Sequence, residues 1–502
     1  MVTGEATADV SAAPREQRDL GDQQPKLSLA EILRLGAAGA VDDSTCPQVQ
    51  SVLAKISLCR THVMGGRKFQ CRDCDEVTSL YNSCGDRHCP TCSGGKRVDF
   101  NDKATKLILP GVNYYQVVFT LPSELSELAL ANREEMADLL VGSAWKSLST
   151  QLKAEQDYDP AAISVLHTWN QKLEAHWHVH LLVPGEGPRL NHRKGLSGAG
   201  WKQATAPPDA KNSDGFHLVR AAALRETYRT RAIAKLRRLR RAGKLKLGGK
   251  FEHLQEDEHW DAFIEKLESK NWVAFIQPPP AATSSATQVV NYLTRYLTGG
   301  PISDHRITSA NGREVTFLAR EGVKAGGDRR QVPITLKTSD FVRRWCLHIQ
   351  PDQLTKTRYF GGWSNNRQAT YSARCQELLE SLGRDVSTVD EATCEEEHPD
   401  LLCEHCGSDR LELVAQTAKP SWKELMWRES DSCPWWYADL QRESHRKFWA
   451  ESYGEGFYDW YRETQVESAK GILAEPTRRI QLPLPGFSPV RDHHESYLID
   501  SF

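Results

Sequence analysis

Trp-His-Val-His-Leu-Leu-Val, residues 177–183, is an apolar run that a Pro-Gly pair terminates. Its length and composition predict a β-strand. Because side chains alternate between the two faces of a strand, His178 and His180 are predicted to share one face. Two imidazoles about 7 Å apart along a strand can chelate one ion. Such a pair is also common as an ordinary polar strand face, so both readings stay open at this point.

Residues just upstream offer a third ligand. His176 has the same parity as the pair, and Gln171 lies where the preceding strand returns. That preceding strand is predicted over residues 162–168. We expect its histidine, His167, to be an ordinary strand residue and not a ligand.

Further segments complete a mixed pattern of helices and strands. The predicted strands are 114–120, 272–276, 315–318 and 332–336, all rich in β-branched or aromatic residues. The predicted helices are 123–151, 286–298 and 338–347. We find no repeat of fixed period. The pattern predicts the α+β class.

The predicted helix 286–298 contains Tyr292 and Tyr296. Residues four apart project from the same side of a helix, so both phenols can face one site. A pair of core tyrosines is the alternative. Tyrosine has a pKa near about 10 and is a poor nucleophile at neutral pH. It becomes competent for phosphoryl transfer when a metal polarises the phosphate, which links the tyrosines to the histidines.

Eight cysteines and histidines lie within residues 59–92. Two short Cys-x2-Cys loops predict a tetrahedral zinc site, and the remaining four residues predict a second one. The first set is Cys71, Cys74, Cys89 and Cys92, and the second is Cys59, His62, Cys84 and His88. Such structural zinc sites fold and bind and do not catalyse. A later pair, Cys403 and Cys406, looks like half a zinc ribbon, but no second half is evident in the sequence.

Length and charge limit the remaining possibilities. A chain of 502 residues predicts two or three domains, and its net charge of −2 predicts no general attraction to a polyanion. Residues 220–250 nevertheless contain 12 lysines and arginines against one acid. No run of 18 apolar residues occurs, so we expect a soluble, cytoplasmic protein with no membrane partner. The arginines predicted to contact DNA are Arg87, Arg237, Arg238, Arg240, Arg241 and Arg295.

Together these motifs resemble the two-tyrosine HUH transposases of rolling-circle bacterial insertion sequences. The resemblance spans about residues 44–363 and keeps the family's order. Its pieces are Cys71-Arg-Asp-Cys74, the cysteine-rich run 81–92, the strand Gln-Val-Val-Phe-Thr-Leu-Pro at 116–122, the histidine-containing stretch 165–180, and Tyr292-Leu-Thr-Arg-Tyr296.

The resemblance implies four segments. These are an N-terminal arm, disordered or helical (1–43); a zinc-binding, DNA-binding domain (44–110); an HUH nuclease domain with an antiparallel sheet, flanking helices and a basic helical insertion (111–363); and a mainly helical C-terminal region (364–502). It also implies that His178, His180 and Gln171 hold Mg²⁺ or Mn²⁺, while zinc is structural. Single-stranded DNA at element ends, and target DNA, would be cleaved and rejoined through 5′-phosphotyrosine links.

Three alternatives remain at this stage. A replication initiator or relaxase uses the same chemistry. A zinc-finger regulator would bind duplex DNA without cleaving it, and a metal-dependent hydrolytic nuclease would leave no protein–DNA link. The sequence does not indicate an oligomeric state.

Overall fold

The computed structural model of the chain describes residues 27–93, 103–109, 111–193, 196–207, 217–279, 300–320, 330–384, 402–427 and 430–453. The predicted α+β class is confirmed, since helices and antiparallel sheets alternate through these residues. Among the helices in these ranges, none has both the length and the apolar character needed to cross a membrane.

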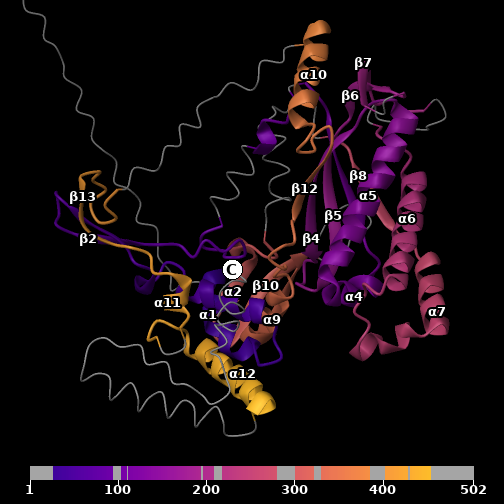
Figure 1. The fold of residues 1–502 in the computed structure, drawn as a ribbon. Coiled ribbons are helices and arrows are strands. Elements are labelled where there is room, and N and C mark those ends of the chain that lie inside the picture. Colours follow the sequence, from indigo (N-terminus) through magenta and orange to yellow (C-terminus); the bar gives the residue numbers. More distant parts are fainter. Residues whose placement is uncertain are drawn as a thin grey trace, which may run out of the picture.

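A five-stranded antiparallel sheet, which we call the central sheet, lies beside the helices α5 (Arg133–Gln156) and α6 (Ala221–Arg241) (Figure 1). Its strand order is β12-β4-β5-β3-β8. The strands are β3 (Tyr114–Thr120), β4 (Ala161–Trp169), β5 (Ala175–Pro184), β8 (Val273–Gln277) and β12 (Thr357–Gly361). The histidine strand β5 is therefore central, which agrees with its near-continuous apolar sequence.

Helices cover one face of this sheet (Figure 1). They are α4 (Ser126–Ala131), α5 (Arg133–Gln156), α6 (Ala221–Arg241) and α7 (Asp257–Glu268). Alternate apolar side chains of the strands, such as Val179 and Phe119, pack against these helices. The ring of Phe119 meets Tyr228 of α6 with centroids 4.9 Å apart. This packing leaves the alternate residues of β5, including both histidines, on the opposite face.

One predicted helix is interrupted. The sequence predicts a single helix over 123–151, whereas α4 ends before Asn132 and α5 begins after it. The Asn132 side chain donates to the carbonyls of Leu128 and Lys246 and accepts from the Lys246 amide at 2.6 Å. This bonding to a distant loop offsets the loss of helical hydrogen bonds at that residue.

On the opposite face of the sheet, apolar packing among the described residues gathers at one end. There α10 (Gln368–Ser381) and Trp363 pack on apolar residues of β4, including Ile163 and Val165. A hairpin of β6 (Glu186–Asn191) and β7 (Leu196–Gln203) adjoins α10. The histidines lie towards the other end of the strands.

A second hydrophobic core draws on distant parts of the chain. It joins α1 (Leu29–Ala40), α2 (Pro47–Leu58), β9 (Ile307–Ala310), β10 (Glu314–Arg320), β11 (Gln331–Lys337), α9 (Thr338–Cys346), α11 (Trp422–Leu425) and α12 (Trp435–Tyr453). Helix α1 begins with a capping box formed by Ser28 and Glu31. The boundaries of the four predicted segments stay predictions, and this core contains residues from all four.

A three-stranded sheet projects away from the hydrophobic cores. It contains β1 (Gly66–Cys71), β2 (Val77–Tyr81) and β13 (Leu411–Thr417) in the order β13-β1-β2. Figure 1 shows this sheet, with β13 and β2 on its two sides, far from the central sheet. Most of its residues are exposed.

Candidate functional site

Three imidazoles converge on the face of the central sheet that α4–α7 leave open. His178 and His180 project from β5, and His167 stands directly opposite His178 on β4. One ring nitrogen from each of the three lies within 4.8 Å of the others. The alternation along β5 and the register with β4 together create this cluster, which we call the histidine triad.

The hydrogen bond of His178 leaves one nitrogen available for an ion. Its Nδ1 lies 3.1 Å from the backbone oxygen of His176. A carbonyl can only accept, so this bond requires the proton on Nδ1. The Nε2 lone pair is then available as a ligand, an arrangement common in metal-binding histidines.

Burial keeps the triad histidines of β5 neutral. Desolvation, reinforced by the neighbouring imidazoles of His180 and His176, lowers the pKa of His178 to about 3. Desolvation and the charge of Lys356 lower the pKa of His180 to about 4. Only a neutral imidazole can bind a metal, so the environment favours the ligand form at neutral pH.

Gln116 on β3 contacts the triad from the other side. Its Nε2 lies 2.6 Å from Nδ1 of His180, while its Oε1 is buried without a hydrogen-bond partner. Rotating the amide by half a turn brings Oε1 to Nδ1, where it accepts the imidazole proton and fixes the orientation of the ring. Gln116 is thus a positioning residue for His180.

We expect Gln116→Ala to weaken Mn²⁺ binding at the triad by about 10- to 100-fold, because His180 loses the partner that orients it. Titration of protein that holds zinc in its thiol clusters but no metal at the triad, followed by the paramagnetic signal of free Mn²⁺, measures this. Gln116→Glu keeps an acceptor and should retain most of the affinity. Gln151→Ala, which alters another buried glutamine with an unpartnered Oε1, is the control; equal affinity in all variants would contradict the assigned role.

Two residues outside the predicted set border the triad. Trp169 stacks on His167 with ring centroids 4.5 Å apart, and Lys356 Nζ lies 4.9 Å from the Trp169 centroid. The charge of Lys356 contributes to the lowered pKa of both His178 and His180, which places it within electrostatic range. The triad thus combines imidazoles, a stacking ring and a cation.

The structure revises the predicted third ligand. Gln171 is exposed in the turn between β4 and β5, and its backbone carbonyl accepts from Arg306. His167, which we expected to be only a strand residue, occupies the third position. The strand register explains this difference, because it pairs His167 of β4 with His178 of β5. The side-chain pattern within one strand does not reveal which residues of a neighbouring strand lie opposite. His176 lies beside His178 with centroids 5.2 Å apart and is outside the triad.

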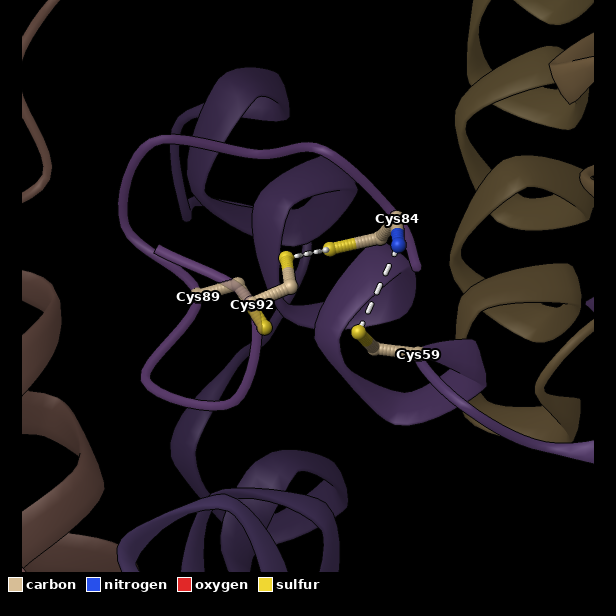
Figure 2. A group of neighbouring side chains, drawn as sticks. All are labelled: Cys59, Cys84, Cys89 and Cys92. Atoms are coloured by element: carbon tan, nitrogen blue, oxygen red, sulfur yellow. Dashed lines mark hydrogen bonds between the residues drawn. The ribbon is translucent and has the colours of Figure 1, made fainter. Parts of the chain in front are cut away.

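Four cysteines form the first thiol cluster (Figure 2). They are Cys59, Cys84, Cys89 and Cys92, whose sulfur atoms all lie within 4.8 Å of one another. The Cys84 and Cys92 sulfurs are 3.5 Å apart, and the Cys84 amide donates to the Cys59 sulfur at 3.4 Å. Tetrahedral zinc with bonds of about 2.3 Å holds sulfurs about 3.8 Å apart, so the donor set fits a zinc ion.

The second thiol cluster contains Cys71, Cys74, Cys403 and Cys406. Both predicted zinc sets are therefore corrected: the two Cys-x2-Cys loops belong to different clusters. Cys71 and Cys74 lie at the tip of the β1–β2 hairpin, and Cys59 and Cys84 flank its base. The six residues of β1 separate tip from base by about 17 Å, which one ion cannot bridge.

The predicted histidine ligands of zinc lie elsewhere. His62 is exposed and belongs to neither thiol cluster. His88 accepts the Gln350 amide at its Nε2 and contacts Asp86 through its Nδ1. It therefore joins the first thiol cluster to the loop at 348–354 and does not serve as a ligand.

Comparison with known proteins identifies the family. A family model described as "Transposase zinc-binding domain" matches residues 35–121, and one described as "Putative transposase" matches residues 161–370. The chain is 31% identical to "Putative transposase y4qJ" of Sinorhizobium fredii over 71% of the chain and 84% of that relative. It is 26% identical to "Transposase for insertion sequence element IS801" of Pseudomonas savastanoi pv. phaseolicola, over 66% of the chain and 74% of the relative. No solved structure matches.

This chain belongs to the two-tyrosine transposases of bacterial insertion sequences. The predicted family is thereby confirmed. In this transposase the first thiol cluster lies inside the matched zinc-binding domain, and the histidine triad lies inside the second matched region. Cys403 and Cys406 lie outside both matches.

The predicted tyrosine nucleophiles fall outside the described residues. Tyr292, Tyr296 and the neighbouring Arg295 belong to the segment 280–299, for which the structure gives no placement. Their assignment in this transposase stays a prediction.

The predicted DNA-contacting arginines divide into two groups. Arg87 donates to the carbonyls of Gln350, Pro351 and Leu354, so its guanidinium is used within the protein. Arg237 pairs with Glu268 and Arg240 with Asp257, which joins α6 to the α7 region. The remaining two predicted arginines of α6 are Arg238 and Arg241. Both are exposed, and neither forms an ion pair within the described ranges. These two suit contact with a DNA backbone better than the others.

Proposed function

We propose that this transposase cleaves and rejoins single-stranded DNA at the ends of its element through 5′-phosphotyrosine intermediates. The histidine triad carries the proposal, because three imidazoles, two of them kept neutral by burial, converge on the face of the sheet opposite α4–α7. Tyr292 and Tyr296 are the proposed nucleophiles. The known relatives are named as transposases, which favours this function over a replication initiator or relaxase.

The proposed reaction conserves the phosphodiester energy. The phenol oxygen of one tyrosine attacks the phosphorus and loses its proton, and the bond from phosphorus to the 3′ oxygen breaks. The departing 3′ oxygen takes up a proton and becomes a hydroxyl. Rejoining reverses these steps when a 3′-hydroxyl attacks the phosphotyrosine, so no nucleotide cofactor is consumed. Two tyrosines allow one strand to be held while a second is cut.

The triad would hold the divalent ion that the chemistry requires. A bound ion there would polarise the phosphate and stabilise the developing charge. His178 and His180 are kept neutral by burial, and Gln116 and the His176 carbonyl orient them. The protein's contribution is therefore to present three imidazole lone pairs in fixed directions.

The described residues that flank the tyrosine-bearing segment contact the central sheet and the turn before β5, which supports the assignment. Strand β8 ends at Gln277, and this residue pairs in register with Gln116, the partner of His180. After the segment, Arg306 donates to the Gln171 carbonyl in the turn that precedes β5. Fifteen positions of chain from Gln277 to Tyr292 are ample to reach the triad.

Basic and aromatic residues near the triad suit a single-stranded substrate. Lys356 and Trp169 offer a cation and a ring beside the imidazoles, and single-stranded DNA is commonly bound by stacking together with phosphate contacts. Arg238 and Arg241 on α6 add positive charge farther along the molecule. We propose that these residues contact the DNA on either side of the cleaved bond.

The donor set predicts a metal preference. The triad contains three nitrogen donors, and no Asp or Glu of the described ranges joins it. Imidazole favours borderline transition ions, whereas Mg²⁺ favours oxygen ligands. At equal low concentrations, we therefore expect Mn²⁺ or Co²⁺ to support cleavage at least about tenfold faster than Mg²⁺. Cleavage rates of a labelled oligonucleotide measure this, and equal rates with Mg²⁺ would argue for additional oxygen ligands.

One experiment distinguishes the proposed function from its competitors. Labelled single-stranded DNA carrying an element end is incubated with the transposase and Mn²⁺ and resolved on a denaturing gel. We expect a labelled band at the mass of protein plus DNA. Free cleaved DNA without this band indicates a hydrolytic nuclease, and intact DNA indicates a binding protein without nuclease activity.

A further inference from the structure

We infer that Cys71, Cys74, Cys403 and Cys406 bind a second structural zinc ion, which fastens β13 to the hairpin of the N-terminal zinc-binding domain. The two halves of this site are far apart in sequence, since Cys71 and Cys406 are separated by 335 positions. The matched zinc-binding domain ends at residue 121 and contains only the first half.

The sulfur positions fit one tetrahedral ion. Cys71 and Cys406 have their sulfurs 3.5 Å apart, and those of Cys74 and Cys403 are 3.6 Å apart. All four lie within 4.8 Å of one another. These separations are close to the roughly 3.8 Å expected around zinc and far above the roughly 2.05 Å of a disulfide.

Each half has the backbone of a metal-binding turn. In the first half, the Asp73 amide donates to the Cys71 sulfur at 3.4 Å, and Asp75 follows with φ 57°. In the second, the Gly407 amide donates to the Cys403 carbonyl at 2.8 Å, with φ 74° at Gly407. The first thiol cluster shows the same amide-to-sulfur contact, from Asp86 to Cys84 at 3.4 Å.

The surrounding sheet has too little buried surface to hold the two halves together. Six of the seven residues of β13 are exposed, including Leu413 and Val414 at 48% each. Two ion pairs link the halves, Arg72 with Glu412 and Arg410 with Asp73, but such exposed pairs contribute only about 0–1 kcal/mol each. A small sheet without a core needs another source of stability, and a zinc ion supplies it.

Glycine at position 65 lets the returning chain pass closely. Its φ is +65°, and a Cβ at this position would collide with the Ala418 carbonyl oxygen. Just beyond, Lys419 donates to the carbonyls of Ser83 and Cys84 beside the first thiol cluster. The C-terminal strand therefore follows the N-terminal hairpin from its tip to its base.

Zinc content tests the inference directly. After a mild chelator has removed metal from the histidine triad, the purified full chain should contain about two zinc ions, and the double variant Cys403→Ser, Cys406→Ser about one. Cys46→Ser, which alters an exposed cysteine outside both clusters, should retain two. Cys406→His offers an alternative ligand and should also retain two, which shows that zinc loss in the serine variant is not general unfolding. Two ions in the serine variant, or disulfides in the native protein detected by mass, would overturn the inference.

Hydrogen exchange tests the fastening role. In the serine variant, amides of β1 and β13 should exchange markedly faster, because their pairing depends on the ion. Amides of α12 should keep their protection, since Trp436 and Tyr437 are buried in the second hydrophobic core. Unchanged exchange in β13 would show that the strand is held without the metal. This result is independent of the proposed cleavage chemistry.

Discussion

Replacing Tyr292 and Tyr296 together by phenylalanine should abolish the covalent protein–DNA adduct on a single-stranded oligonucleotide that carries an element end. Phenylalanine keeps the ring and removes the oxygen that would attack the phosphorus, so binding should persist while bond formation stops. No other atom in the proposed reaction can take the place of this oxygen as the nucleophile. The measurement is the labelled protein band on a denaturing gel, with binding followed separately by a mobility shift.

The single variants and a control sharpen this test. Each single change should leave adduct formation at one strand while preventing the joining of two strands, because the second phenol is then missing. Tyr81→Phe alters an exposed tyrosine on β2 of the projecting sheet and should retain both activities. An adduct that survives the double change would exclude these residues as the nucleophiles, and peptide mapping would identify the linked residue.

Loss of His178 or His167 should reduce cleavage by about 100-fold or more while leaving DNA binding largely intact. Each side chain supplies one of three nitrogens that lie within 4.8 Å of one another. Removing a ligand lowers the affinity for an ion that is expected to stabilise the transition state by several kcal/mol. Each loss of about 1.36 kcal/mol corresponds to a tenfold lower rate. Because the β5 imidazoles are neutral at pH 7, they contribute no positive charge to DNA binding.

Two neighbouring residues serve as controls for the triad. His176→Ala removes an adjacent imidazole that lies outside the triad, and we expect it to cost little. Gln171→Ala separates the sequence-based ligand set from the structural one. A large loss for Gln171→Ala with a small loss for His167→Ala would restore the ligand set expected from sequence.

Local patterns in the sequence predicted the sheet well. The strand predicted over 114–120 is β3 without any shift, and the strands predicted over 162–168 and 177–183 are β4 and β5 with one or two more residues at each end. These strands are continuous runs of β-branched, aromatic and apolar residues between turn-forming residues. Parity within β5 also placed His178 and His180 correctly on one face. Helix 338–347 was predicted equally well, because α9 depends on local spacing.

Errors arose where the answer depended on two distant segments. The Cys-x2-Cys loops are genuine metal-binding turns, but their spacing does not reveal that a hairpin carries one loop away from the other. Cys403 and Cys406 appeared to lack a second half because that half lies more than 300 positions earlier. Likewise, the sequence around Arg87 did not show that its guanidinium donates hydrogen bonds to backbone carbonyls of the protein.

The sequence by itself determined the family, the α+β class, the strands, and the shared face of His178 and His180, because these follow from residue types and from periodicity within one element. Only the tertiary structure decided which residues meet: His167 with the histidine pair, Gln116 behind His180, and the C-terminal cysteines with Cys71 and Cys74. The physical reason is that packing between elements sets the strand register and brings distant segments of the chain together. The alternation of side chains, by contrast, is set by the backbone of a single element.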